Sequence, residues 1–342
     1  MADKDSQIVI AGAGSIGCYA GGCLAVAGRK VRFLCRPNIE ARLRAGGLRV
    51  SDLDGRDRLL DAGAIHATTD PAEALTDASV VLVTVKSGAT EEMGGLIAAH
   101  APPDAVIVSL QNGVDNVGRL QALVGSRWVL AGMVAFNVVQ KNGGESLHVH
   151  RATEGAALIE SGVSGLAELL DVAGFSVQAH ADMRAVLWGK LLFNLNNALV
   201  ALSGLPLATE LADRRWRLIL ARQIDEALAV LRAASITPGR IGGLRPSLLP
   251  KILRLPDWLF RLVARRMLMV DPEARASMWD DLERGRPTEI AEFQGKIMRL
   301  AADTGTPVPL TQRIMRLVEA AEANEAGSPQ LSPEAVLDGI GR

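Results

Sequence analysis

The sequence feature that most constrains the fold is a glycine-rich loop directly after a short apolar run. Residues 12–17 read Gly-Ala-Gly-Ser-Ile-Gly, and apolar runs occupy 8–11 before them and 31–34 after a segment of small residues. Between two strands, this GxGxxG spacing lets the backbone approach a pyrophosphate closely at a helix N-terminus. We therefore expect a dinucleotide site here, and the residues expected to form it are Gly12, Gly14, Ser15, Ile16 and Gly17. A purely structural glycine turn is the alternative.

The rest of the chain divides into two patterns. Continuous apolar runs are typical of parallel strands buried on both faces, and they occur at 8–11, 31–34, 80–85, 106–110 and 128–134. Segment 50–60, centred on Asp54-Gly55, predicts an added hairpin. From Asp182 the apolar spacing is helical. We expect an α/β fold with a Rossmann-type doubly wound sheet over 1–181, an all-helical C-terminal domain over 182–325, and a flexible tail over 326–342 that is rich in Gly, Ser and Pro.

Composition excludes several classes of protein. With 37 basic against 38 acidic residues, the chain lacks the positive charge of a nucleic-acid-coating protein. The only tyrosine is Tyr19, and the residue four positions later is Cys23, so the Tyr-x-x-x-Lys motif of tyrosine-based short-chain reductases is missing.

Cysteine usage and hydropathy indicate a compartment. The three cysteines have no disulfide or metal-ligand spacing, so we expect no metal site and a reducing, cytoplasmic location. The polar N-terminus does not resemble a signal peptide. Segment 187–207 is the most apolar long stretch, but Lys190 and three asparagines interrupt it, and we expect no membrane span.

Arg36 indicates which dinucleotide binds. It follows the second apolar run, where an NAD-binding enzyme normally carries an Asp or Glu for the ribose 2′-hydroxyl. A guanidinium group instead suits a 2′-phosphate, so the sequence favours NADP(H) over NAD(H). A solvated loop arginine is the alternative.

Two further strand ends carry polar groups, namely Lys86 after Val85 and Asn112 before Gly113. Open α/β sheets bind ligands at the carboxyl ends of their strands. Lys86 could meet the cofactor phosphates or the substrate, and Asn112 could position the nicotinamide ribose or the substrate carbonyl. Either residue could instead merely cap a following helix.

Lys190 is one of only seven lysines, and it lies in an apolar segment that reads as a buried helix over 185–199. At about 100° per residue, Asn194 and Asn197 lie within about 40° of Lys190, whereas Asn196 points away. An unpaired buried amine is costly, so Lys190 should face a cleft, and desolvation should lower its pKa. A surface lysine with a buried stem is the alternative.

A second candidate segment reads as helix, break, helix over 277–290. Ser277 and Asp281 lie one turn apart, and Glu289 falls in the first turn of the second helix. With Arg286 at the cap and Pro287 at the first helical position, Glu289 could simply stabilise the helix dipole as an N3 acid. Spacing alone slightly favours that structural interpretation.

These segments together resemble the ketopantoate reductases (2-dehydropantoate 2-reductases) over nearly the whole chain. The resemblance implies that Lys190 is the general acid, Glu289 assists at the substrate oxygen and contacts the cofactor, and Ser277 holds the substrate carboxylate. It further implies that Asn194 binds substrate, that Lys86 and Asn112 serve the cofactor and active site, and that Arg36 binds an NADP phosphate. The implied site lies in the cleft between a Rossmann domain and a helical domain.

The chain departs from the family pattern in two places. Where many members carry a second substrate-binding asparagine, it has Ala198, for which Asn197 could substitute. The stretch 238–271 looks longer than in compact members and is basic, with Arg245, Lys251, Arg254, Arg261, Arg265 and Arg266 against Asp257 before Asp271. A packed or partner-facing helix is favoured there over a membrane-surface helix.

The resulting hypothesis is NADPH-dependent reduction of ketopantoate to D-pantoate for pantothenate synthesis. An enzyme of the same chemistry acting on another 2-oxo acid or ketone is the first alternative. A non-catalytic NADP sensor is the second, and it leaves Lys190, Asn194 and Ser277 without a purpose. The expected partners are a small 2-oxo acid and, in assembly, a second copy of the chain as a homodimer, but no nucleic acid.

Overall fold

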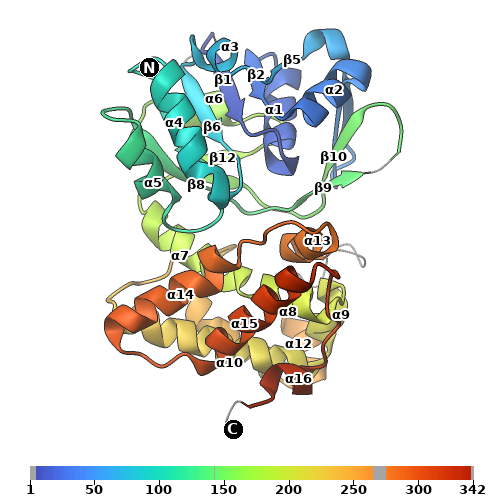
Figure 1. Cartoon of the computed structure of the whole chain (residues 1–342), viewed down its shortest axis with the longest axis vertical. Helices are drawn as coiled ribbons and strands as arrows, with labels where there is room; N and C mark the ends of the chain where they lie inside the picture. Colours follow the sequence, from blue (N-terminus) through green and yellow to red (C-terminus); the bar gives the residue numbers. More distant parts are fainter. Residues whose placement is uncertain (1–4, 142, 265–274, 340–342) are drawn as a thin grey trace. The chain divides into compact units, whose positions relative to one another are not determined.

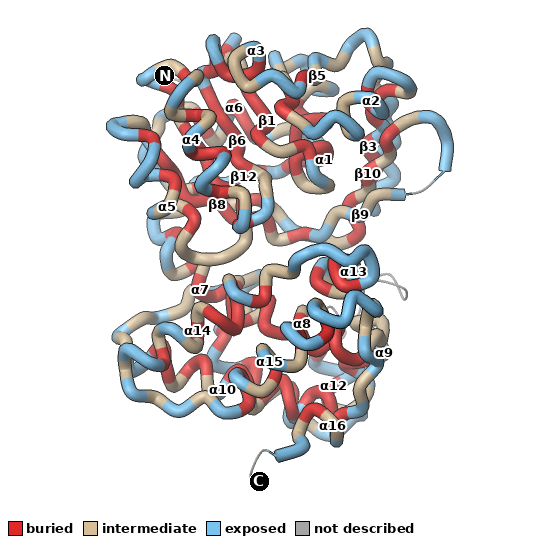
Figure 2. The backbone as a smooth tube through the Cα atoms, in the orientation of Figure 1, coloured by how far each residue is buried: buried red, intermediate tan, exposed pale blue. Residues whose placement is uncertain are grey.

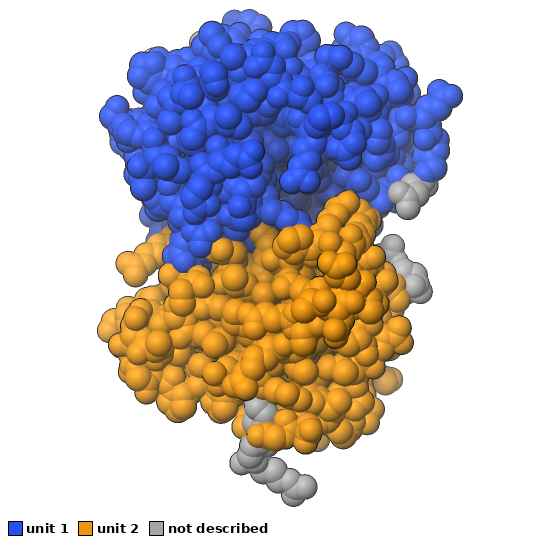
Figure 3. All heavy atoms as spheres, viewed as in Figure 1, with its two compact units in different colours: residues 1–183 blue, residues 184–342 orange. Residues whose placement is uncertain are grey.

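The computed structural model describes residues 5–141, 143–264 and 275–339. The chain forms two compact units that divide after Met183 (Figure 3), close to the predicted boundary at 181. These are the N-terminal unit, residues 1–183, and the C-terminal unit, residues 184–342.

The N-terminal unit is built on an eight-stranded sheet (Figure 1). Its spatial order is β12-β11-β8-β7-β6-β1-β2-β5. The strands are β1 (Ile8–Ala11), β2 (Val31–Leu34), β5 (His66–Thr68), β6 (Val80–Val83), β7 (Val106–Ser109), β8 (Val129–Val134), β11 (Ala157–Glu160) and β12 (Val177–His180). The six strands from β5 to β8 are parallel, and the chain order reverses between β1 and β6. This is the doubly wound arrangement that the sequence predicted, with its topological switch point beside the glycine loop.

Both faces of this sheet are buried, which explains the continuous apolar runs. Ile8 and Ile10 belong to one core cluster, and Val9 and Ala11 belong to a second cluster on the opposite face. Figure 2 shows the buried central strands. The helices of this unit are α1 (Ser15–Val26), α2 (Pro37–Gly46), α3 (Pro71–Leu75), α4 (Thr90–His100), α5 (Asn116–Leu123) and α6 (Leu166–Leu170), with 3-10 turns at Ala62–Ala64 and Ser87–Ala89.

A second, four-stranded sheet packs on the other side of α1. Its order is β4-β3-β10-β9, with β3 (Leu48–Asp52), β4 (Asp57–Leu60), β9 (Val138–Lys141) and β10 (Leu147–Arg151). The predicted hairpin is confirmed as β3 and β4, but its parallel pairing with β10 was not predicted. The small residues of α1 allow both sheets to approach, because a Cβ at Gly21 would meet Phe33 at 2.4 Å and one at Gly22 would meet Val50 at 2.5 Å.

The described part of the C-terminal unit contains helices and no strand, as predicted. The helices are α7 (Met183–Asn194), α8 (Asn196–Ser203), α9 (Leu207–Ala212), α10 (Arg214–Ala233), α11 (Leu249–Leu253), α12 (Asp257–Val263), α13 (Ser277–Glu283), α14 (Ile290–Thr304), α15 (Pro309–Asn324) and α16 (Pro333–Leu337), with a 3-10 turn at Pro246–Leu248. The single helix expected over 185–199 is divided at Leu195 into α7 and α8. Segment Met183–Ser203 is long and apolar enough to cross a membrane, but 72% of its apolar window is buried inside the protein, as in a core helix.

The tail differs from the flexible segment that its composition suggested. Residues 326–339 are described, and Leu331 donates from its backbone N–H to the carbonyl of Leu202 at 2.8 Å. The last helix, α16, buries Val336 completely. Ser332 caps this helix through its hydroxyl, and Pro333 occupies the first helical position, so these residues begin a helix here. Residues 340–342 lie outside the described residues.

The basic stretch 238–271 packs against α10 through a buried arginine. The Arg217 guanidinium lies 4.2 Å above the Phe260 ring, donates to the carbonyls of Leu253 and Leu255, and pairs with Asp257. The outer face of α12 leaves Trp258 70% exposed. The expected packed helix therefore accounts for residues 246–264. Arg265, Arg266 and Asp271 lie outside the described residues.

Candidate functional site

The glycine loop between β1 and α1 has the geometry of a phosphate cradle. Gly12 adopts a φ of +106°, and a Cβ there would lie 2.5 Å from Val85 Cγ1. A Cβ at Gly17 would lie 2.3 Å from the Gly12 carbonyl oxygen, so α1 can approach β1 only because this residue is glycine. At Gly14, by contrast, an added Cβ would meet nothing within 4 Å. The loop is therefore tight where it packs and open where a ligand can approach.

The N-terminus of α1 faces this opening without a side-chain cap. The helix begins at Ser15, Gly14 is the N-cap residue, and the first turn carries no acidic residue. The first N–H groups of a helix lack intrahelical partners and carry partial positive charge, so they suit a diphosphate. The open space at Gly14 and the uncapped helix end both fit a bound dinucleotide.

Arg36 follows β2, at the same carboxyl edge of the sheet as the glycine loop. It is the N-cap residue of α2, is exposed, and makes no side-chain hydrogen bond or ion pair with any described residue. Its guanidinium is therefore available to a ligand. The solvated-arginine alternative fits this geometry equally well, so the choice between them rests on cofactor binding.

Lys86 and Asn112 lie on neighbouring loops that a buried polar network joins. Ser87 Oγ donates to the carbonyl of Asn112 at 3.1 Å, and Gln111 Nε2 donates to the carbonyl of Val85 at 3.1 Å. Further bonds join the side chains of Thr90, Asn116, Ser109, Gln111 and Ser87. Because Lys86 and Asn112 occupy loops fixed by several bonds, their positions at the sheet edge are restrained.

Lys86 does not cap a helix with its side chain. Lys86 is the N-cap residue of the 3-10 turn at Ser87–Ala89 but makes no cap bond, and Asn112 lies three residues before Asp115, the N-cap residue of α5. The capping alternative is therefore wrong for Lys86. Ser87, Thr90 and Asn116 were not predicted, because only their position close to the strand ends distinguishes them in the sequence.

In the C-terminal unit, α7 presents Lys190 in apolar surroundings. Trp188, Leu191 and Leu192 are buried on either side of it in the chain. Although Lys190 as a residue is partly exposed, burial of the amine lowers its pKa from 10.5 to about 8. No described carboxylate lies within ion-pair distance of Lys190. This amine is still mostly protonated at pH 7 and can give up its proton readily.

The asparagines beside Lys190 take different positions. Asn194 is buried near the end of α7, and Asn197 is partly buried on α8. Asn196 faces the interior, where its Nδ2 donates to Glu210 Oε2 at 2.9 Å. Ala198 is completely buried, so this position contributes apolar packing. Asn194 and Asn197 therefore remain the candidates for contact with a substrate.

Glu289 is not the third residue of a helix, the position from which it was expected to stabilise the helix dipole. Helix α14 begins at Ile290, so Glu289 is its N-cap residue rather than the third residue of its first turn, and its side chain makes no cap bond. Pro287 lies outside the helix in the preceding loop. Thr288 anchors that loop, because its N–H donates to Glu322 Oε1 and its hydroxyl accepts from the N–H of Ile290. The N3 interpretation is therefore wrong.

Two contacts hold α14 against α7. Gln294 Nε2 donates to the carbonyl of Leu195 at 3.0 Å, and Lys296 Nζ lies 5.8 Å from the centre of the Trp188 ring. The start of α14, with Glu289, is thus held to the end of the helix that carries Lys190. Neither Gln294 nor Lys296 was predicted as part of the site, because no sequence pattern distinguishes them from other polar residues of a helix.

Ser277 begins α13, which packs on α8. Ser277 is exposed and Asp281 is buried one turn later. Arg275, just before the helix, lies 4.5 Å from the Trp279 ring and donates to the carbonyl of Gly204. The helix that carries Ser277 is therefore fixed on the same part of the unit as Asn197.

His148 and His150 lie on the outer face of β10, away from the glycine loop's sheet. Both rings hydrogen-bond Ser51 Oγ at 2.8 Å. Burial and the nearby cations Arg49 and Lys141 lower the pKa of His148. These histidines have a local structural partner, and no group of three or more His, Cys, Asp or Glu residues among the described positions could hold a metal.

A doubly wound sheet with a glycine-rich loop after its first strand, joined to a helical unit with a lysine of lowered pKa, is typical of dinucleotide-dependent oxidoreductases. Residues 8–161 match the family described as "Ketopantoate reductase PanE/ApbA", and residues 182–322 match its C-terminal counterpart. The chain therefore belongs to the ketopantoate reductase family, whose members are oxidoreductases acting on CH–OH and C=O groups. The resemblance stated from sequence is confirmed.

Similar proteins span almost the whole chain. The 2-dehydropantoate 2-reductase of Archaeoglobus fulgidus is 27% identical over 326 residues, covering 93% of this chain and 98% of the relative. A ketopantoate reductase structure from Ralstonia eutropha JMP134 is 29% identical with a TM-score of 0.77, covering 93% of this chain and 99% of that one. A D-mandelate dehydrogenase with NADH and anilino(oxo)acetate shares the fold at 19% identity and a TM-score of 0.75, with coverage of 93% and 99%.

Proposed function

We propose that this protein is an NADPH-dependent 2-dehydropantoate 2-reductase, which reduces ketopantoate to D-pantoate in pantothenate biosynthesis. The observation that carries the proposal is Lys190, a partly exposed lysine whose pKa burial lowers to about 8 on a helix that also carries Asn194. Carbonyl reduction needs a proton donor near neutrality, and this amine has the required acidity.

In the proposed mechanism a bound nicotinamide supplies the hydride to the keto carbon. Lys190 donates a proton to the oxygen as negative charge develops there, so that the C=O group becomes CH–OH. Lys190 stays mostly charged at pH 7 because its pKa is about 8, and loss of the proton relieves the desolvation of the ammonium group. Glu289 assists at the same oxygen and contacts the cofactor.

The remaining predicted residues hold the two ligands. Asn194 and Asn197 bind the substrate's polar groups, and the Ser277 hydroxyl donates to its carboxylate. Asn112 positions the substrate carbonyl or the nicotinamide ribose, and Lys86 binds the cofactor phosphates. The open position at Gly14 and the uncapped start of α1 support diphosphate binding at the glycine loop.

NADP(H) is the proposed cofactor because Arg36 is exposed at the end of β2 and pairs with no described residue. Arg36→Asp should weaken NADPH binding and spare NADH binding, measured by fluorescence titration of both cofactors. Equal loss of affinity for both cofactors would contradict this role. The NADH complexes of D-mandelate dehydrogenase make NAD(H) the alternative to test.

Substrate identity is tested by kcat/KM for ketopantoate with NADPH against a panel of other 2-oxo acids. The panel includes pyruvate, 2-oxoisovalerate and phenylglyoxylate. A clear preference for ketopantoate supports the proposal, whereas a preference for any other acid favours the alternative. Ala198 is the observation behind that alternative, because its methyl group is buried and cannot replace an amide that binds substrate.

We place the enzyme in the cytoplasm and expect a homodimer. The cysteines Cys18, Cys23 and Cys35 are free, as a reducing compartment requires. A Staphylococcus aureus ketopantoate reductase of the same fold is described as dimeric. Size-exclusion chromatography with light scattering tests the assembly, and a monomer at micromolar concentration would contradict it.

A further inference from the structure

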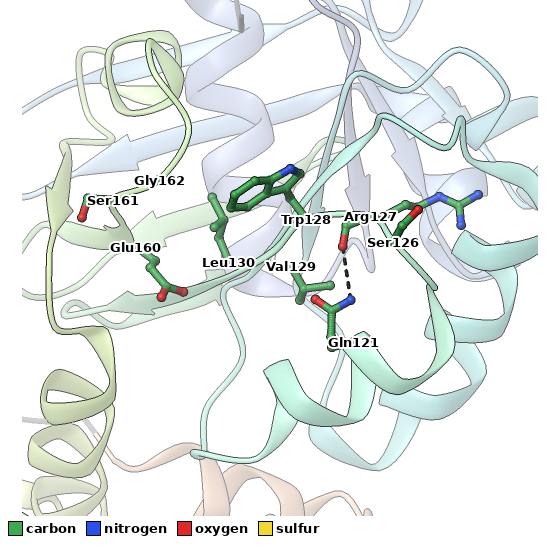
Figure 4. A pocket seen from close by; sticks show the side chains of 9 residues that line it. All are labelled: Gln121, Ser126, Arg127, Trp128, Val129, Leu130, Glu160, Ser161 and Gly162. Carbon is green, nitrogen blue, oxygen red and sulfur yellow. Dashed lines mark hydrogen bonds between the residues drawn. The ribbon is translucent and has the colours of Figure 1, made fainter.

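The N-terminal unit contains a surface hollow of about 360 Å³ that the proposed reaction does not use (Figure 4). Trp128 lies just before β8, and Glu160 is the last residue of β11, which runs antiparallel to β8. The hollow therefore lies where β8 begins. The glycine loop follows the end of β1, which is parallel to β8 through β6 and β7, so it lies at the opposite edge of the sheet. The volume is in the range of small-ligand sites.

An unusually exposed tryptophan lines this hollow. Trp128 is 60% exposed, more than any other large apolar side chain described in the N-terminal unit. Gly162 faces it without a side chain, since a Cβ there would lie 4.0 Å from Trp128 Cζ3 and 3.7 Å from Leu130 Cδ2. An indole face is thus left accessible to a ligand.

A carboxylate lines the same hollow and has no cationic partner among the described residues. Glu160 Oε2 accepts from the N–H of Ala131 at 3.0 Å, which fixes the side chain and leaves Oε1 for another donor. Figure 4 shows the Arg127 guanidinium directed away from Glu160. That guanidinium donates instead to the backbone carbonyls of Pro102, Val124, Ala98 and Ala101.

From this arrangement we infer that the hollow binds a small organic cation with a planar ring, such as an arylamidinium or a protonated heteroaromatic amine. The ring stacks on Trp128, whose π face attracts a cation, and the N–H donors pair with Glu160. Arg127 also lines the hollow, but its guanidinium is directed away from Glu160 and is bonded to backbone carbonyls, so an anionic ligand would meet the Glu160 carboxylate instead. The site therefore discriminates against 2-oxo acids and dinucleotides and is separate from the proposed reductase chemistry.

Benzamidine is a suitable probe, with neutral benzamide and anionic benzoate as isosteric comparisons. Isothermal titration and the indole N–H signal of Trp128 in NMR spectra should report saturable binding of benzamidine, with benzamide at least about fivefold weaker and benzoate not binding. Equal affinity for benzamidine and benzamide would overturn the inference. Competition with NADPH would also overturn it, because it would move the probe to the cofactor site.

Three substitutions locate the site. Glu160→Gln keeps an acceptor for the Ala131 N–H but removes the charge, and Trp128→Ala removes the ring; each should weaken benzamidine binding at least about fivefold. Gly162→Leu should fill the hollow and abolish binding, and its backbone φ lies outside the left-handed region. Trp258→Ala is the matched control, because Trp258 is also a largely exposed tryptophan but belongs to the C-terminal unit.

Unchanged affinity in Glu160→Gln, or an equal loss in Trp258→Ala, would contradict the site. Thermal unfolding and NADPH titration of each variant establish that it is folded. If Gly162→Leu does not fold, Glu160→Gln and Trp128→Ala still decide the question, since both change exposed or half-buried side chains.

Discussion

The two units form their parts of the candidate site in different ways. In the N-terminal unit the proposed cradle consists of backbone: Gly12 and Gly17 permit close packing, and the N–H groups at the start of α1 are the proposed donors. In the C-terminal unit the candidate groups are side chains, chiefly Lys190, whose acidity depends on what packs around it. The glycine loop should tolerate substitutions that keep the backbone N–H groups and add no bulk near the phosphates. The candidate site in the C-terminal unit should instead lose function when the Lys190 side chain is replaced.

The largest effect is expected at Lys190. Lys190→Ala should lower kcat by at least about a hundredfold, since general acid catalysis typically contributes about 10²- to 10⁴-fold. The affinity for NADPH should stay nearly unchanged, because the glycine loop belongs to the other unit. Steady-state kinetics and a cofactor titration test both parts, and near-native turnover would remove Lys190 from the mechanism.

The pH profile of the wild-type enzyme is the control for that result. With a pKa of about 8, the proton donor is fully present well below pH 8 and is lost as the pH rises through that value. The rate of carbonyl reduction should therefore fall about tenfold per pH unit above pH 8. A flat profile between pH 7 and 10 would contradict the assignment of Lys190 as the acid.

The next largest effect concerns a carboxylate buried among the helices of the C-terminal unit. Glu210 is 1% exposed, Asn196 donates to it, and its Oε1 has no partner among the described residues. Burial raises its pKa from 4.5 to about 8, so the folded state holds a proton that the unfolded state loses. This contribution to stability is fully present below pH 4.5 and declines as the pH rises through about 8, by a few kcal/mol.

Glu210→Gln should remove this pH dependence, because a neutral amide has no proton to lose. Urea unfolding at pH 5 and pH 8 measures it, and the difference between the two pH values should shrink relative to the wild type. Glu319→Gln, at an exposed position of α15, is the matched control. If the free energy of unfolding changes by the same amount between pH 5 and pH 8 in the wild type and in Glu210→Gln, Glu210 is charged in the folded protein.

A smaller effect is expected from added bulk at the open position of the cradle. Gly14→Ala introduces one methyl group where nothing lies within 4 Å, so the fold should lose less than about 1 kcal/mol. The methyl group would occupy space that a diphosphate needs, and NADPH affinity should fall by about tenfold or more, about 1.4 kcal/mol. Gly118→Ala in α5, which also has nothing within 4 Å, should leave the affinity unchanged.

The same contrast explains how far the sequence alone could predict the structure. The order of strand, glycine loop and helix was predictable because these elements are consecutive in the chain. The placement of Lys190 and Asn194 on one helix was predictable from the apolar spacing, whereas Asn197, expected on the same helix, lies on α8. The pairing of β3 with β10 was not predictable, because Val50 and Val149 are far apart in the sequence and no local pattern links them.

The positions at which helices begin could not all be predicted from residue spacing. The helix start at Ile290, which separates Glu289 from the N3 position, depends on the Thr288 loop being held by Glu322 on another helix. The Gly, Ser and Pro content of the tail predicts flexibility, but composition does not take the order of the residues into account. In sequence, Ser332 followed by Pro333 is a helix start, and that signal was available.

The smallest effect is expected at Ser15, and it tests the contrast most directly. Ser15 is the first residue of α1, and the proposed interaction uses its backbone N–H, which every residue except proline retains. Ser15→Ala should therefore change NADPH affinity by less than about twofold, whereas Ser15→Pro should lower it by removing the donor. A tenfold loss in Ser15→Ala would show that the hydroxyl binds phosphate, and the cradle would then depend on a side chain, as the site in the helical unit does.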